Sequence, residues 1–95
     1  MHIHMISKSP LSSQALQQAL PFVTTEDYIV LIDDGVYAVN NYCNQKHDKP
    51  HDKWLAIDSD LTMRGITLTN QHIQAISTAD FVKLCFQAKH IISWY

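Results

Sequence analysis

Two adjacent carboxylates and a glycine, Asp33-Asp34-Gly35, follow the apolar run over residues 28–32. Such a run, without polar alternation, is typical of a parallel strand covered on both faces. Open α/β sheets bind ligands at the carboxyl ends of their strands, where paired carboxylates can hold Mg²⁺ or exchange protons. The same residues also suit a strand-ending turn, in which Gly35 supplies an unusual backbone conformation and one aspartate caps the next helix. We favour the turn.

Histidines gather in two other places. His47 and His51 lie close together with two aspartates and could ligate a metal ion. Pro50 lies between them and prevents the helix that would bring both imidazoles to one face, so we expect a solvated loop over residues 44–52. His2 and His4 are two residues apart and therefore lie on the same face of the first strand, where they provide polar cover or contact a partner.

The two cysteines, Cys43 and Cys85, are too few for a disulfide framework and form no metal-binding pair. Cys85 falls on the apolar face of the last helix, which is the usual place of an inert core thiol. Cys43 lies in a loop and is the better candidate for a reactive thiol, although no arginine or helix N-terminus stands near it in the sequence to lower its pKa. The residues alone predict no catalytic group, no metal and no cofactor.

Strands and helices alternate along the chain to position these residues. Short apolar runs predict strands over residues 3–7, 28–32, 54–57 and 72–77, and residues 91–95 form a last edge strand or a docking tail. Helical spacing predicts helices over residues 11–23 and 36–41, a third helix that Asp58 or Ser59 caps and that runs to Arg64, and a last helix that follows Thr78. This alternation predicts one α/β domain over residues 1–95, with a mostly parallel sheet and helices on both faces.

Capping residues refine these helices. Ser9 or Ser12 is expected to cap the first helix, and Pro21 to kink or end it. Gly65 suits the position just after the third helix.

Charged pairs and an apolar stripe refine the later helices. Asp60 and Arg64 stand four residues apart in the favourable order for an ion pair. Thr78 is expected to cap the last helix, with Asp80 in its first turn. The apolar face of that helix is predicted to consist of Phe81, Val82, Cys85, Phe86 and Ala88.

Composition limits the class of protein. The chain has 95 residues, 46% hydrophobic and only 17% charged, with a net charge of −2 and a pI near 6.3. Disorder and a basic nucleic-acid footprint are therefore excluded, and tight binding of tRNA or DNA by this chain alone is not expected. The start lacks a signal-peptide pattern and no apolar run could span a bilayer, so we expect a cytoplasmic protein without a membrane partner. Low charge also indicates that another chain covers part of the surface.

Several stretches, taken in order, resemble the TusB/DsrH family of sulfur-relay proteins. They are Ile3-His4, Lys8-Ser9-Pro10, the run Leu-Ile-Asp-Asp-Gly-Val-Tyr-Ala over residues 31–38, the run Asp-Leu-Thr-Met-Arg-Gly-Ile over residues 60–66, Asp-Phe-Val-Lys-Leu over residues 80–84, and Trp94. The resemblance implies a DsrEFH-like fold. Asp34, Gly35, Asp60, Arg64 and Gly65 then belong to family motifs at structural turns.

The resemblance also implies a function. TusBCD-type complexes pass persulfide sulfur toward 2-thiouridine at the tRNA wobble position, and the carrier cysteine belongs to the TusD subunit. DsrH proteins of sulfur oxidisers carry a cysteine in their first helix, at the position that Ala19 occupies here. This chain is accordingly expected to be a non-catalytic, TusB-like subunit with TusC-like and TusD-like partners.

Two other functions stay open. Cys43 could carry persulfide sulfur itself, or His47 and His51 could form a metal-binding module. For the partner surface the candidates are His4, Trp94 and Tyr95, although both aromatics would also suit the chain's own core. Self-association of the isolated chain is a further expectation, since an interface left without its partner exposes apolar surface.

Overall fold

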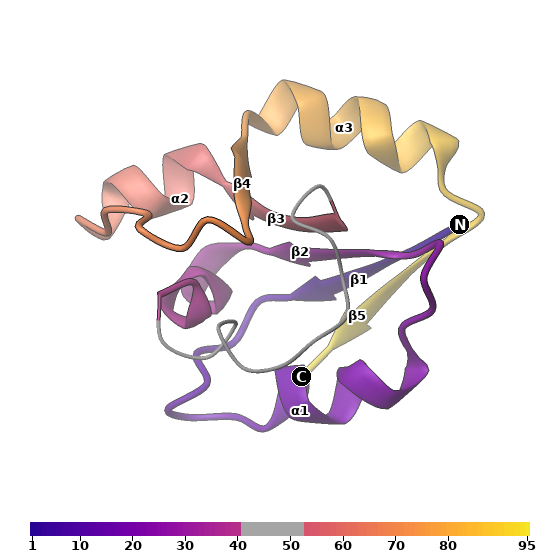
Figure 1. Cartoon of the computed structure of the whole chain (residues 1–95), viewed down its shortest axis with the longest axis horizontal. Helices are drawn as coiled ribbons and strands as arrows, with labels where there is room; N and C mark the ends of the chain where they lie inside the picture. The colour runs from indigo at the N-terminus through magenta and orange to yellow at the C-terminus, as the bar shows by residue number, and fades with distance from the viewer. Residues whose placement is uncertain (41–52) are drawn as a thin grey trace.

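Five parallel strands form the sheet of this protein, for which a computed structural model describes residues 1–40 and 53–95. The strands lie in the order β4-β3-β2-β1-β5 (Figure 1). Their bounds are β1 (His2–Ile6), β2 (Tyr28–Leu31), β3 (Trp54–Ile57), β4 (Gln74–Ile76) and β5 (His90–Trp94). The prediction of a small α/β domain with a mostly parallel sheet is confirmed. Of the two readings of residues 91–95, the edge strand is the observed one, with bounds His90–Trp94.

Helices cover both faces of the sheet. On one face, hereafter the α1 face, lie α1 (Ala15–Ala19), the 3-10 helices η1 (Leu20–Phe22) and η2 (Asp33–Ala38), and α2 (Asp58–Met63), whose apolar residues share one core cluster. The opposite face, hereafter the α3 face, is covered by α3 (Thr78–Gln87) and has its own cluster. Figure 1 shows α1 and α3 on opposite sides of the strands.

Strand side chains alternate between these two clusters, as the pleat requires. In β3, Trp54 and Ala56 point to the α1 face, whereas Leu55 and Ile57 point to the α3 face. All four are buried, which explains why the sequence of a central parallel strand shows no polar alternation.

The first helix is shorter than predicted. It begins at Ala15 and has no side-chain cap, so neither Ser9 nor Ser12 caps it. The Ser9 carbonyl instead accepts hydrogen bonds from the amides of Ser12 and Ser13, at 3.1 and 3.0 Å, and closes a separate turn. At the other end the proline acts as expected: α1 gives way to η1, which has Pro21 in its first turn.

The helix after β2 also differs from the prediction, because it is a 3-10 helix that begins at Asp33. The last predicted strand before α3 is reduced to residues 74–76.

Helix α3 begins one residue earlier than predicted, because Ser77 and not Thr78 caps it by accepting from the Asp80 amide at 3.1 Å. Its contact face also differs. Phe86 is 86% exposed and Val82 46% exposed. The residues of α3 and its C-terminal end that pack against the sheet are Phe81, Leu84, Cys85 and Ala88.

Two predictions about α2 are confirmed. Gly65 adopts a left-handed φ of 64° immediately after the helix, as a C′ glycine does. The Gly65 amide donates to the Thr62 carbonyl at 3.1 Å and the Ile66 amide to the Leu61 carbonyl at 2.9 Å, which satisfies two terminal carbonyls of α2. Asp60 and Arg64 do form the expected ion pair, at 3.6 Å.

Candidate functional site

The two motif segments that lie far apart in sequence meet at the carboxyl ends of β2 and β3. Arg64, at the end of α2, reaches the Asp34 carboxylate of η2 at 3.1 Å as well as Asp60 of its own helix. A second link is the Asp33 amide, which donates to the Asp60 carboxylate at 2.9 Å. Asp60 therefore caps the first turn of η2 from outside, a role that the sequence assigned to one of the two aspartates at positions 33 and 34.

Gly35 has a different role from the one predicted. The residue with a left-handed backbone in this turn is Asp33, with φ of 47°, a conformation that aspartate tolerates better than most residues. Gly35 is needed for space, because a β-carbon there would lie far inside van der Waals contact of the Ile6 carbonyl. The turn thus packs its backbone directly onto the end of β1.

A shallow pocket of about 180 Å³ lies beside this network. Its apolar lining consists of Ile32, Ile57 and Phe81, and its polar lining of Asp33, Ser59, Asp60 and Thr78. The Asp60 carboxylate already accepts the Asp33 amide and pairs with Arg64. Within residues 1–40 and 53–95, no three His, Cys, Asp or Glu side chains come together as metal ligands would. The groups around Asp33 and Asp60 therefore form a turn that is held in place by a hydrogen bond and an ion pair.

A buried polar network occupies the α1 face near the start of the sheet. His4 is only 1% exposed; its Nε2 lies 3.1 Å from an Asp27 carboxylate oxygen. Its Nδ1 accepts a hydrogen bond from the indole N–H of Trp94 at 3.1 Å. Because an indole nitrogen can only donate, neutral His4 must carry its proton on Nε2, where it donates to Asp27. One hydrogen-bonded chain thereby joins the start of β2 to β1 and to the end of β5.

Asp27 is the acceptor on which this network depends. Besides His4 it accepts backbone hydrogen bonds from His2 and Thr24, both at 3.0 Å. Burial raises the pKa of Asp27, but the hydrogen bonds from Thr24, His2 and His4 outweigh it and hold the pKa well below its ordinary value. Asp27 is therefore a buried carboxylate anion. Because both His4 nitrogens are engaged, the imidazole holds the strands together and has no free position for acid–base chemistry.

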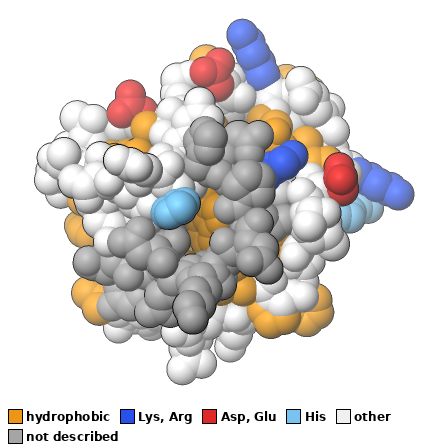
Figure 2. Space-filling view, viewed as in Figure 1, with side chains coloured by type: hydrophobic (Ala, Val, Ile, Leu, Met, Phe, Trp, Pro, Cys, Tyr) orange, Lys and Arg blue, Asp and Glu red, His pale blue; other side chains and the backbone are white. Residues whose placement is uncertain are grey.

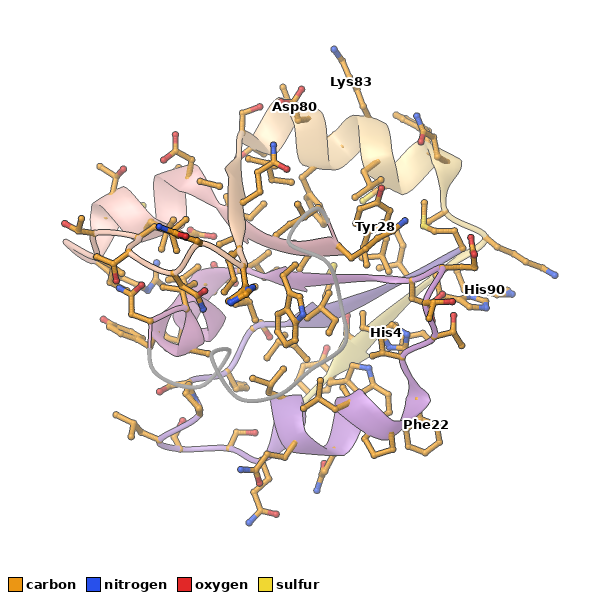
Figure 3. The ribbon with its side chains drawn as sticks, viewed as in Figure 1. His4, Phe22, Tyr28, Asp80, Lys83 and His90 are labelled. Atoms are coloured by element: carbon orange, nitrogen blue, oxygen red, sulfur yellow. The ribbon has the colours of Figure 1, made fainter. Side chains whose placement is uncertain are left out.

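Figure 3 labels His4 of β1 and, in the same part of the view, Phe22 of η1 and His90 of β5. The Phe22 ring stacks on Trp94 at 5.5 Å between ring centroids, and the His90 ring stacks on that of His2 at 5.2 Å. Sequence reasoning missed Asp27 altogether, and no local pattern could have revealed it, because His4 is 23 residues away from it in the chain.

The three candidate interface residues differ from one another in their exposure to solvent. His4 faces the interior of its own chain, so its side chain offers no partner contact. Trp94 packs against the core cluster of the α1 face, and Tyr95 is exposed.

The remaining candidates concern sulfur and metal chemistry. Ala19, for which the resemblance implies the position of a family cysteine, is buried in α1. Cys85 is half-buried, and burial raises the pKa of its thiol, which disfavours the reactive thiolate. Cys43, His47 and His51 lie outside the described residues.

No helix within the described part of the chain is long and apolar enough to cross a membrane.

Comparison with known proteins identifies the family. A search of curated proteins finds no match. The family model for DsrH like proteins matches residues 8–91, nearly the whole chain, and includes both motif segments at the sheet edge. Proteins of this family take part in sulfur relay together with partner subunits. This chain belongs to the DsrH-like family and has a role related to sulfur relay.

Proposed function

We propose that this chain is the non-catalytic, TusB-like subunit of a cytoplasmic TusBCD-type complex that relays persulfide sulfur toward 2-thiolation of the tRNA wobble uridine. The observation that carries the proposal is that residue 19 is an alanine. By the family resemblance, this is the position at which DsrH proteins of sulfur oxidisers have a cysteine. A persulfide carrier needs a thiolate that a donor protein can reach. Position 19 offers no thiol, and its β-carbon is packed into the core of the α1 face.

The chemistry of the other described groups supports a structural role. Raising the pKa of Cys85 leaves less thiolate at neutral pH, so this thiol is a poor sulfur acceptor. In both polar networks the acids and bases are already paired, Asp27 with His4 and Asp34 with Arg64. Such groups hold elements in place, and the persulfide cysteine is accordingly assigned to a TusD-like partner.

The surface is compatible with a subunit that leaves tRNA binding to other chains. On the face shown in Figure 2, the Lys and Arg side chains of the described residues lie apart from one another and form no basic patch. The net charge of the chain is −2. Because tight binding of nucleic acid depends on neutralising several phosphates with clustered basic groups, this face is poorly suited to hold tRNA.

The test is complementation of a strain that lacks this chain, with 2-thiouridine in tRNA measured by mass spectrometry. The deletion should abolish or strongly reduce thiolation, and the Cys43→Ser, Cys85→Ser and doubly substituted chains should restore it to the wild-type level. Purification of the tagged chain should recover two small α/β partners, one with a reactive cysteine.

Two results would contradict the proposal. Thiolation that persists in the deletion strain would remove the tRNA role. Loss of thiolation with Cys43→Ser alone, in a chain that still assembles with its partners, would make this chain the sulfur carrier.

A further inference from the structure

The two edges of the sheet are protected very differently. Edge strand β4 is only three residues long, and such a short edge offers little to a pairing strand. Edge strand β5 is five residues long and pairs with β1 in continuous register, without bulge or proline. Its sequence His-Ile-Ile-Ser-Trp contains no charged residue. Ile91 is 46% and Ile92 36% exposed. A long, uncharged, apolar edge is the kind that pairs with another strand.

Backbone geometry identifies the groups that β5 presents outward. The Lys89 amide donates to the Met1 carbonyl at 2.8 Å, which directs residue 89 toward β1. Because N–H and C=O groups alternate in direction along a strand, the amides of Ile91 and Ser93 also point toward β1. The N–H and C=O groups of residues 90, 92 and 94 then point away from the sheet, where the described part of the chain supplies no further strand.

From this edge we infer that a second copy of the chain pairs with β5 antiparallel, about a twofold axis at Ile92, so that two five-stranded sheets join into one. A twofold axis perpendicular to the sheet makes identical edges antiparallel and places each outward residue opposite another outward residue. Ile92 meets Ile92 of the second copy, and His90 meets Trp94 of the second copy. Every outward N–H and C=O of the strand is then paired.

The side chains of β5 suit this symmetric arrangement. No like charges face each other, because the strand has none. Lys89 lies opposite Tyr95 of the second copy, where an ammonium group over an aromatic ring is favourable. On the α1 face, Ile92 would contact its symmetry mate, and the Phe22 ring, which is 65% exposed, stacks on Trp94 at the end of the same strand. The pairing thus covers apolar groups as well as the backbone edge.

The size of the contact sets the expected affinity. The area that a five-residue edge strand and the neighbouring Phe22 ring can bury is smaller than the roughly 800 Å² per partner of a standard stable interface. We therefore expect a dimer with a dissociation constant in the range of about 1–100 μM. The inference concerns the isolated chain and does not depend on the proposed role in sulfur relay.

The first experiment combines sedimentation equilibrium of the purified chain with residue-resolved amide exchange between about 1 μM and 1 mM. The wild type should convert from monomer to dimer. Exchange of the outward amides of His90, Ile92 and Trp94 should slow by at least about tenfold over this range. The inward amides of Ile91 and Ser93 should be protected at both concentrations. A monomer throughout, or outward amides whose exchange is independent of concentration, would overturn the inference.

Charge substitutions at the axis test the register. Ile92→Lys places two ammonium groups opposite each other across the twofold and should weaken dimerisation at least tenfold, as should Ile92→Glu. An equimolar mixture of the two variants should dimerise again, because only the mixed pair brings opposite charges together. Neither substitution changes the backbone, and circular dichroism of each variant verifies the fold.

Phe86→Lys is the matched control, since it adds the same charge at an exposed apolar residue on α3. It should dimerise like the wild type. A dimer that Ile92→Lys leaves intact or that Phe86→Lys disrupts would refute pairing through β5, as would failure of the Lys and Glu variants to associate when mixed.

Discussion

Replacing Asp27 by asparagine tests the buried network most directly. The substitution keeps the shape of the side chain but converts one carboxylate oxygen into an NH₂ group, which can only donate. If this group replaces the oxygen near His4, it faces both the Nε2–H of His4 and the Thr24 amide. His4 could move its proton to Nδ1, but that proton would then face the indole N–H of Trp94. Either arrangement leaves buried donors without an acceptor.

The magnitude follows from the number of bonds lost. A hydrogen bond to a charged acceptor contributes about 1.5–3 kcal/mol, and a buried donor left unpaired costs about as much again in desolvation. Because at least one such bond is lost and a second is weakened, we expect Asp27→Asn to lower the free energy of unfolding by about 3 kcal/mol at pH 7. Urea denaturation followed by tryptophan fluorescence would measure it.

The stability that Asp27 contributes also depends on pH, in a direction that its pKa determines. The pKa of Asp27 is lower in the folded chain than in the unfolded chain, so its contribution is present above the unfolded pKa of about 3.9 and is lost as the pH falls toward the folded pKa. The difference between wild type and Asp27→Asn should therefore shrink steadily between pH 5 and pH 2. Glu26→Gln removes a charge from the exposed neighbouring residue and should change stability by less than about 0.5 kcal/mol. An Asp27→Asn chain as stable as this control, or a difference independent of pH, would refute the reasoning.

Three further substitutions test the packing of the turns and of β5. Gly35→Ala should destabilise the fold by about 3 kcal/mol or more in the same urea assay, because the added β-carbon collides with the Ile6 carbonyl and a backbone must move. Gly65→Ala should cost only about 1 kcal/mol, since no atom lies near the new methyl group and only the left-handed φ of 64° is strained. Trp94→Phe keeps an aromatic ring but removes the donor to His4, and should lower the thermal midpoint by roughly 4–8 °C, equivalent to about 1 kcal/mol. Equal costs for the two glycine substitutions, or an unchanged midpoint for Trp94→Phe, would contradict these assignments.

The central strands could be predicted from the sequence because burial on both faces removes polar residues from them. All four residues of β3 are buried and all four are apolar or aromatic. Strand β4 was predicted with poorer bounds because two of its three residues, Gln74 and Ala75, are exposed. An edge strand with exposed residues needs no regular hydrophobic pattern, so its ends cannot be read from local sequence.

Helix positions were harder to predict because apolar spacing does not say which side faces the sheet. In α3, Val82 and Phe86 continue the apolar stripe, yet both are exposed, and the contact is made instead by neighbours such as Leu84. In the first helix Leu11 fits the stripe but is 81% exposed, because the Ser9 carbonyl closes a turn ahead of the helix. In both places contacts with other parts of the chain override local propensity.

The candidate site shows the same limit. The ion pair between Asp60 and Arg64 was predictable because four residues is one helical turn. The link from Arg64 to Asp34, 30 residues away, depends on two strand ends meeting at one edge, and the link from His4 to Trp94 spans 90 residues. Local spacing carries no information about such pairs, so the sequence showed the motif residues without showing that they touch.

Strand β5 connects the buried network with the proposed edge pairing. Trp94 is the last residue of β5, and Asp27 holds His4, which in turn accepts the indole N–H. A strand can template a partner only if its outward groups are already fixed in an extended line, because ordering about five residues on binding would cost roughly 1 kcal/mol or more for each. The network anchors the carboxyl end of β5, and the amide of Lys89 anchors its amino end. Contacts inside the chain therefore hold the β5 edge in the conformation that pairing needs. A change that removes the contacts of Trp94 should weaken dimerisation through β5 under conditions in which the chain is still folded.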